Sequence, residues 1–204
     1  MSGSRLSSRG VTLQLAAHDR NGESLAMSDP QDHRAQIVRC YTPTLRYSPF
    51  FMTHPDRFFE DYVRGDVHEC GSVEVSEAEI IEFARSFDPQ PMHTDPIAAA
   101  RGQFGGLVAS GWHTTALVMR LYVAHYLSIP SSLASPGVDE LRWPHPVRPG
   151  DVLRVRATVL DTMPSRGRSD RGIVRAKVEA QNQDGKPVLT AVLLSIIGRR
   201  PQEG

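Results

Sequence analysis

The sequence predicts an α+β fold in which one antiparallel β-sheet wraps around a long central helix. Residues 116–127 are apolar on most sides of a helix, so protein must surround them. Two later segments, residues 151–160 and 173–181, alternate apolar and polar side chains, as half-buried strands do. Turn signals join these strands as hairpins, which gives an antiparallel sheet with one apolar face for the helix. The chain of 204 residues suits one such domain.

The first quarter of the chain differs from the rest in composition. Residues 1–54 are rich in Ser, Arg, Asp, Gln and Pro without lasting periodicity, so we predict a disordered or poorly structured tail before a domain at 55–200. Met52 lies in this tail, and a native start near it is our hypothesis. Residues 1–18 lack acidic side chains, as transit peptides do, but have no apolar secretory core. We expect a cytoplasmic protein.

The domain opens with a strand and an amphipathic helix. The segment SVEV at 72–75 is typical of a short strand, and Ser76 with Glu79 forms a capping box that begins a helix. The apolar stripe of this helix is Ile80, Phe83, Ala84 and Phe87. Pro89 disfavours the α conformation in the residue before it, so the helix should end at residue 87 or 88.

Two further helices precede the main sheet. Asp95 and Pro96 are the expected N-cap and first residue of a short helix that closes at Gly102. A Gly-rich loop then leads into the long apolar helix, which begins near Ser110 and Gly111. Beyond it, the dipeptides at 149–150 and 184–185 indicate turns, and residues 188–198 are apolar enough for an inner strand.

Charge and cysteine content exclude several classes of protein. Lys plus Arg equals Asp plus Glu at 23 each, so no overall field attracts nucleic acid or an anionic membrane. Residues 114–129 carry Arg120 and His125 and are too short for a membrane span. Cys40 and Cys70 are the only cysteines, and we expect free thiols. The histidines lack metal-ligand spacing, so we predict no metal site.

The stretch FARSFDPQPMHTDP, residues 83–96, brings an acid and an imidazole together where a helix ends. Water addition to an α,β-unsaturated thioester needs one group that takes a proton from water and a nearby group that delivers one to the α-carbon. Pro89 and Pro91 restrict the loop between Asp88 and His93, so both side chains can be held at one water. The alternative is that Asp88 only ends the helix and that His93 only packs or lies in solvent.

From residue 58 to 198 the chain resembles MaoC-like dehydratases of the hot dog fold, kin to (R)-specific enoyl-CoA hydratases. The signature of that family is Asp-x-Asn-Pro-x-His at the end of a helix, and the chain has Asp88, Gln90 and His93 in a variant Asp-Pro-Gln-Pro-x-His form. The resemblance implies that Asp88 and His93 are the catalytic pair and that the protein forms a homodimer or a larger even oligomer. It also implies an acyl-CoA or related thioester substrate, with coenzyme A as part of the substrate and no separate cofactor.

The start of the long helix offers a site for the thioester oxygen. Its unpaired N–H groups and positive dipole end favour an oxygen that gains negative charge, and Gly111 allows close approach. We therefore expect Gly111, Ser110, Gly106 and Gln90 to bind the oxyanion or the substrate. The alternative for the glycines is close packing, and both roles are compatible. We further expect burial to raise the pKa of Asp88, a charged His93 to lower it, and the pair to titrate together.

The favoured function is a reversible hydratase or dehydratase of an enoyl or 3-hydroxyacyl thioester. A thioesterase is less favoured, because the fold's thioesterases generally use a carboxylate on the long helix and residues 110–135 contain none. A noncatalytic acyl-thioester-binding or regulatory module is the alternative from another class. We interpret His113 as structural. The basic segment 165–172 is a solvated hairpin tip or, as the alternative, a contact for coenzyme A phosphates.

Overall fold

The computed structural model describes residues 56–202 of the chain. The predicted tail at 1–54 and the hypothetical start at Met52 lie outside these residues. A single turn of 3₁₀-helix, Phe59–Asp61, precedes the sheet and helices. The strands are β1 Val67–Glu74, β2 Ser132–Arg142, β3 Val152–Pro164, β4 Arg171–Gln181 and β5 Pro187–Gly198, and the helices are α1 Glu77–Phe87, α2 Pro91–Thr94, α3 Pro96–Ala100 and α4 Gly111–His125.

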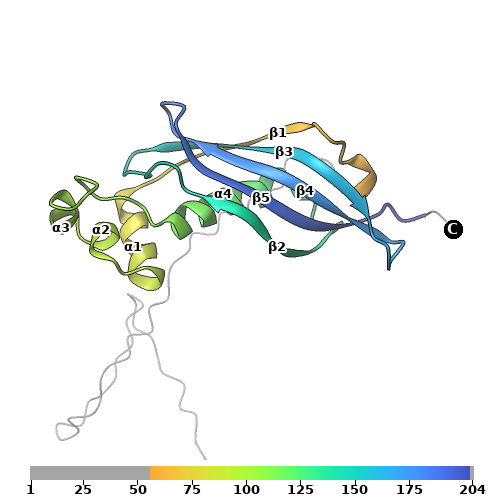
Figure 1. Cartoon of the computed structure of the whole chain (residues 1–204), viewed down its shortest axis with the longest axis horizontal. Coiled ribbons are helices and arrows are strands. Elements are labelled where there is room, and N and C mark those ends of the chain that lie inside the picture. The colour runs from red at the N-terminus through yellow and green to blue at the C-terminus, as the bar shows by residue number, and fades with distance from the viewer. Residues whose placement is uncertain (1–55, 203–204) are drawn as a thin grey trace, which may run out of the picture. The chain divides into compact units, whose positions relative to one another are not determined.

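The five strands form one antiparallel sheet in the order β1-β3-β4-β5-β2, which curves over α4 (Figure 1). Strands β3, β4, β5 and the end of β1 confirm the sequence prediction. Strand β2 was not located from the sequence, because nearly all of its residues are exposed and it includes Pro136 and Gly137. Its pairing with β5 is irregular at three points, so it lacks the alternation that marks a strand.

The core lies between the inner face of the sheet and one side of α4. The predicted inward residues of β3 and β4 are at most 1% exposed: Leu153, Val155, Ala157, Val159, Val174, Ala176, Val178 and Ala180. From α4, the residues at positions 117, 118, 121 and 122 belong to the same cluster. The alternation read from the sequence therefore identified the buried face of both strands correctly.

Most residues of α4 are buried or half-buried, in keeping with the prediction that protein surrounds this helix, but one face remains exposed. Trp112, Met119 and Val123 are 58%, 36% and 40% exposed and lie at helical spacing. These apolar side chains therefore stay partly uncovered within residues 56–202. Throughout the same range no helix is long and apolar enough to cross a membrane.

Helices α1, α2 and α3 group together beyond one end of the sheet (Figure 1). The predicted capping box is present: Ser76 Oγ accepts from the Glu79 N–H, and the Glu79 carboxylate accepts from the Ser76 N–H. Helix α1 ends with Asp88 as its C-cap, and Asp95 caps α3 ahead of Pro96. These termini place the Asp88–His93 loop beside the first turn of α4.

Candidate active site

The loop between α1 and α2 is a chain of short-range backbone hydrogen bonds. The Asp88 N–H donates to the Ala84 carbonyl as the last bond of α1, and the Gln90 N–H donates to the Asp88 carbonyl at 2.7 Å. The Gln90 carbonyl accepts from the His93 N–H at 2.9 Å. Pro91, the first residue of α2, has no N–H to leave unpaired. These hydrogen bonds connect Asp88 to His93 through the backbone of the loop.

Asp88 and His93 face one another across a short gap. Their closest atoms, Oδ2 and Nε2, are 3.6 Å apart, and their side chains are 19% and 8% exposed. His93 Nδ1 lies 2.7 Å from the Val108 carbonyl, which can only accept, so Nδ1 carries the hydrogen. In the neutral imidazole, Nε2 therefore presents a lone pair toward the carboxylate. The gap is too long for a direct hydrogen bond and suits a water that donates to both atoms.

Two side chains hold the Asp88 carboxylate in the charged form. Ser110 Oγ donates to Oδ2 at 2.6 Å, and Gln90 Nε2 donates to Oδ1 at 2.7 Å. The hydrogen bond from Ser110, followed by the one from Gln90, lowers the pKa of Asp88 below its ordinary value. Burial acts in the opposite direction but is the smaller influence, and His93 lowers the pKa further. The pKa increase expected from desolvation is therefore outweighed by hydrogen bonds that the sequence did not reveal.

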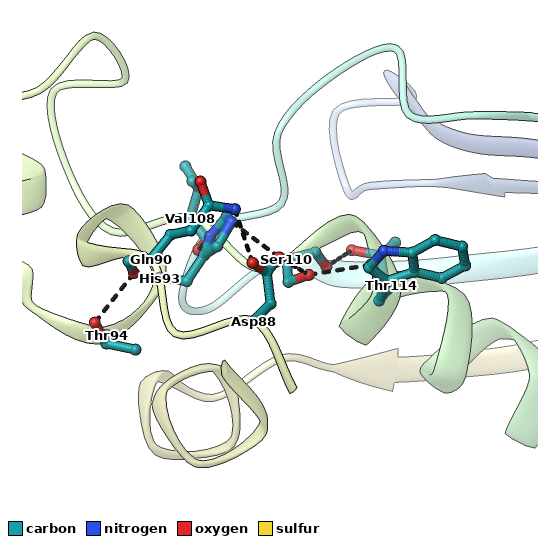
Figure 2. A network of polar contacts seen from close by, with 8 residues as sticks. Asp88, Gln90, His93, Thr94, Val108, Ser110 and Thr114 are labelled. Atoms are coloured by element: carbon teal, nitrogen blue, oxygen red, sulfur yellow. Dashed lines mark hydrogen bonds and ion pairs between the residues drawn. The ribbon is translucent and has the colours of Figure 1, made fainter. Parts of the chain in front are cut away.

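Ser110 connects the carboxylate to the long helix. It is fully buried and is the N-cap of α4, where its Oγ accepts from the Trp112 N–H at 3.2 Å. Its only hydroxyl hydrogen goes to Asp88, so it has none for a substrate oxygen. Figure 2 shows Asp88 between Ser110 on one side and Gln90 and His93 on the other. Ser110 and Gln90 therefore orient the Asp88 carboxylate through these hydrogen bonds.

Gly111 lies in close contact with Trp143, a residue just after β2. A Cβ on Gly111 would be 2.5 Å from an indole carbon of Trp143, closer than real contacts allow. The indole is fixed in turn by a hydrogen bond from its Nε1 to Thr115 Oγ1 at 3.1 Å. Among the described residues, no acceptor is found for the Gly111 N–H, which is the first of α4. The close-packing role of Gly111 is thus present.

Gly106 and His113, also singled out from the sequence, form no hydrogen bond with the pair among the described residues. Gly106 lies beneath Arg148, whose Nη2 donates to the Phe104 carbonyl at 2.6 Å, and no hydrogen bond within residues 56–202 joins Gly106 to Asp88 or His93. His113 is buried and stacks on Phe83, and burial lowers its pKa. Neither residue takes part in the hydrogen-bond network that the described residues form around Asp88.

The basic hairpin tip, residues 165–172, lies at the other end of the sheet from α1–α3 (Figure 1). There Asp170 pairs with Arg168 and Arg171, which neutralises part of the positive charge locally. The position favours a solvated tip over a coenzyme A contact in the same protomer.

The part of the chain that the structure describes also shows how potential metal ligands are grouped and where the Cys70 thiol lies. No group of three or more His, Cys, Asp or Glu side chains there could hold a metal ion. Cys70 is a free buried thiol, as predicted, and burial raises its pKa to about 11. Such a thiol is a poor nucleophile at neutral pH. Cys40 lies outside the described residues.

Comparison with known proteins decides the family. A family model described as a MaoC like domain matches residues 62–182. The chain belongs to the MaoC-like family. Its five-stranded antiparallel sheet curved over one long helix is the hot dog fold, as predicted. The matched range includes Asp88, His93 and the loop before α4, and these follow one another along the chain as the sequence analysis described.

Three similar proteins show the range of this MaoC-like family. The crystal structure of the MaoC-like dehydratase from Rhodospirillum rubrum is 43% identical, with a TM-score of 0.66 over 72% of this chain and 99% of that one. The uncharacterized protein YdeM of Bacillus subtilis is 31% identical over 140 residues, 69% of this chain and 98% of its own length. The 3-hydroxybutyryl-CoA dehydratase of Methylorubrum extorquens is 30% identical over 117 residues, 55% of this chain and 69% of that protein.

Proposed function

We propose that this MaoC-like protein is a hydro-lyase that adds or removes water reversibly on an enoyl or 3-hydroxyacyl thioester. The thioester we propose is a CoA ester. The observation that carries the proposal is the convergence of Asp88 Oδ2 and His93 Nε2, 3.6 Å apart, beside the first turn of α4. Two acceptors that face one gap suit the binding of a water that both can activate. The similarity to a 3-hydroxybutyryl-CoA dehydratase supports the substrate class.

In the hydration direction, the bound water donates its hydrogens to Asp88 Oδ2 and His93 Nε2. The oxygen bonds to the β-carbon while Nε2 takes the proton, and the imidazolium then returns that proton to the α-carbon. The hydrogen bonds from Ser110 and Gln90 lower the pKa of Asp88, which makes its carboxylate a poor proton acceptor. It stays ionised and stabilises the imidazolium. No atom is gained or lost beyond the added water.

The Gly111 N–H is the proposed donor to the thioester oxygen. Negative charge builds on that oxygen as the enolate forms, and the positive end of the α4 dipole lies at the same point. The packing of Trp143 against Gly111 fixes this turn in advance. We propose that the reaction needs neither a metal nor a separate cofactor, since acid–base groups and one N–H donor supply its steps. We also propose a cytoplasmic location.

We propose a homodimer formed through the uncovered face of α4. Trp112, Met119 and Val123 make this helix face apolar, and the neighbouring edge strand β2 exposes Leu133 and Val138. Pairing of edge strands and burial of this face would remove an aggregation hazard. Met119→Glu should shift sedimentation at micromolar concentration from dimer to monomer, whereas Val63→Glu, at another exposed position, should not. A wild-type monomer would contradict the proposal.

The hydro-lyase proposal is tested by loss of absorbance of the conjugated thioester when the full chain is mixed with crotonyl-CoA. We expect hydration that persists after preincubation with a chelator. A protein that binds the acyl-CoA without turnover would be the acyl-thioester-binding module considered as the alternative. Release of free coenzyme A without hydration would instead indicate a thioesterase, which the lack of acidic residues in α4 disfavours.

A further inference from the structure

Asp151 is a buried acidic residue directly before β3, and the proposed proton transfers do not use it. Its Oδ2 accepts from the Arg148 N–H at 2.8 Å, and its Oδ1 accepts from Gln183 Nε2 at 2.9 Å. Gln183 is fixed in turn, because its Oε1 accepts from the Val152 N–H at 3.0 Å. A buried carboxylate requires such donors. The side chain of Asp151 is therefore held in one orientation inside the turn at 147–151.

The backbone N–H that Asp151 accepts belongs to the peptide group between Val147 and Arg148. The C=O of this same peptide group is the Val147 carbonyl, which accepts from the Ala109 N–H at 2.8 Å. A trans peptide group is planar, and its N–H and C=O point in opposite directions. Asp151 on one side and Ala109 on the other therefore fix the direction of the Val147 carbonyl.

A second peptide group continues this series of hydrogen bonds to the proposed catalytic histidine. The Ala109 N–H belongs to the peptide group whose C=O is the Val108 carbonyl, and this carbonyl accepts from His93 Nδ1 at 2.7 Å. Three hydrogen bonds of 2.7, 2.8 and 2.8 Å thus lead from His93 Nδ1 through two peptide groups to Asp151 Oδ2.

All three hydrogen bonds have the same direction, with each donor on the His93 side and each acceptor on the Asp151 side. Hydrogen bonds in series polarise one another and strengthen each bond by about 10–30%. A carboxylate at the acceptor end makes the Val108 carbonyl a stronger acceptor for the hydrogen on Nδ1. The imidazole then keeps its Nε2 lone pair toward the gap that separates it from Asp88.

The turn at 147–151 also contacts the two segments that hold Asp88. The Asp151 carbonyl accepts from the Val75 N–H at 2.9 Å, just before α1, and Asp88 is the C-cap of that helix. Ser110, which donates to the Asp88 carboxylate, directly follows Ala109 in the chain. Both members of the proposed catalytic pair are therefore placed relative to one turn.

We propose that Asp151 is a positioning residue for His93 and acts through the peptide groups 147–148 and 108–109. Its carboxylate orients and polarises these groups, so that the Val108 carbonyl keeps the hydrogen on His93 Nδ1. The consequence for turnover rests on the proposed hydro-lyase function, whereas the effect on the imidazole does not depend on it.

The test compares Asp151→Ala and Asp151→Asn with the matched control Asp61→Ala. Asp61 Oδ2 likewise accepts the backbone N–H of the residue three positions earlier, Phe58, at 2.8 Å. Asp61 ends the 3₁₀ turn, which lies at the other end of the sheet from α1–α3 (Figure 1). The Nδ1–H of His93 is followed by NMR in the full chain, and crotonyl-CoA hydration is measured on the same proteins.

In Asp151→Ala the Nδ1–H of His93 should exchange with solvent about fivefold faster and its resonance should move upfield, because its hydrogen bond weakens. The kcat should fall by about tenfold while KM changes by less than about twofold, since a misoriented imidazole slows proton transfer and leaves substrate binding intact. Asp151→Asn keeps an acceptor for the Arg148 N–H and loses the charge. It should show smaller changes in the same directions, and it serves as the test if Asp151→Ala does not fold. Asp61→Ala should match wild type in all three measurements.

An Nδ1–H signal that matches wild type in the folded Asp151 variants, or equal changes in Asp61→Ala, would overturn the positioning role. Wild-type kcat in variants whose Nδ1–H has changed would also contradict it. Turnover by wild type with an unchanged Nδ1–H in the variants would remove the role of Asp151 and leave the hydro-lyase. Nδ1–H changes confined to the Asp151 variants, in a protein without any turnover, would support the positioning of His93 and contradict the hydro-lyase.

Discussion

Ser110→Ala is the most informative single substitution, because this buried hydroxyl makes two hydrogen bonds with different consequences. Loss of the N-cap bond to the Trp112 N–H should cost about 1 kcal/mol of unfolding free energy. Loss of the 2.6 Å bond to the Asp88 carboxylate should add about 1.5 kcal/mol, near the lower end for a charged acceptor because Asp88 is partly exposed. The total is about 2–3 kcal/mol in urea unfolding at neutral pH.

The pH dependence separates the two losses. Ser110 is the main cause of the lowered pKa of Asp88, so its removal raises that pKa toward the ordinary value. A depressed carboxyl pKa stabilises the fold fully above the unfolded pKa, about 3.9, and this stability is lost as the pH falls through the folded pKa. The stability difference between Ser110→Ala and wild type should therefore narrow in acid. The titration of the Asp88 carboxyl group, followed by NMR, should move to higher pH.

Ser76→Ala is the matched control, since Ser76 is also a helix N-cap but lies at the start of α1 and makes no bond to Asp88 among the described residues. It should lose about 1 kcal/mol of stability, with the titration of the Asp88 carboxyl group unchanged. An Asp88 titration in Ser110→Ala that coincides with that of wild type and Ser76→Ala would refute the role of Ser110 in holding the Asp88 carboxylate.

Two further substitutions test the residues around the pair. Gly111→Ala should destabilise the fold and reduce turnover, because its Cβ meets Trp143 at 2.5 Å. Adding Trp143→Ala removes this clash and keeps the N–H of residue 111. Turnover of the double variant should therefore equal that of Trp143→Ala alone. Persistent loss in the double variant would show that the clash is not the cause. Gln90→Glu places a second negative charge at Asp88 and should raise the pKa of Asp88, so the titration of the Asp88 carboxyl group moves to higher pH. A titration unchanged from wild type would contradict this contact.

Local rules in the sequence were sufficient for most elements of the fold. The capping box at Ser76, the end of α1 before Pro89 and the N-cap at Asp95 depend on neighbours a few residues away, and all three occur as predicted. The alternation in β3 and β4 likewise follows from one buried face. Strand β2 could not be located, because its register depends on β5, which lies far along the chain, and its own residues stay exposed.

The composition of the site was predictable, but its hydrogen bonds were not. The motif identified Asp88 and His93, whose side chains face each other. The Val108 carbonyl that sets the His93 tautomer is a backbone atom and leaves no signal in the residue type. Ser110 was expected to bind substrate oxygen, whereas its hydrogen is directed to Asp88, 22 positions earlier. The contact between Trp143 and Gly111 also joins residues far apart along the chain and needs the folded sheet to form.

The central claim is that Asp88 and His93 together perform proton transfer on a thioester substrate. The most direct measurement is the steady-state rate of crotonyl-CoA hydration by Asp88→Asn and His93→Ala, with urea unfolding confirming that each variant is folded. Each substitution removes one of the two groups that share the water, so kcat should fall by about two decades or more in both. Turnover close to wild type in either folded variant would contradict the claim.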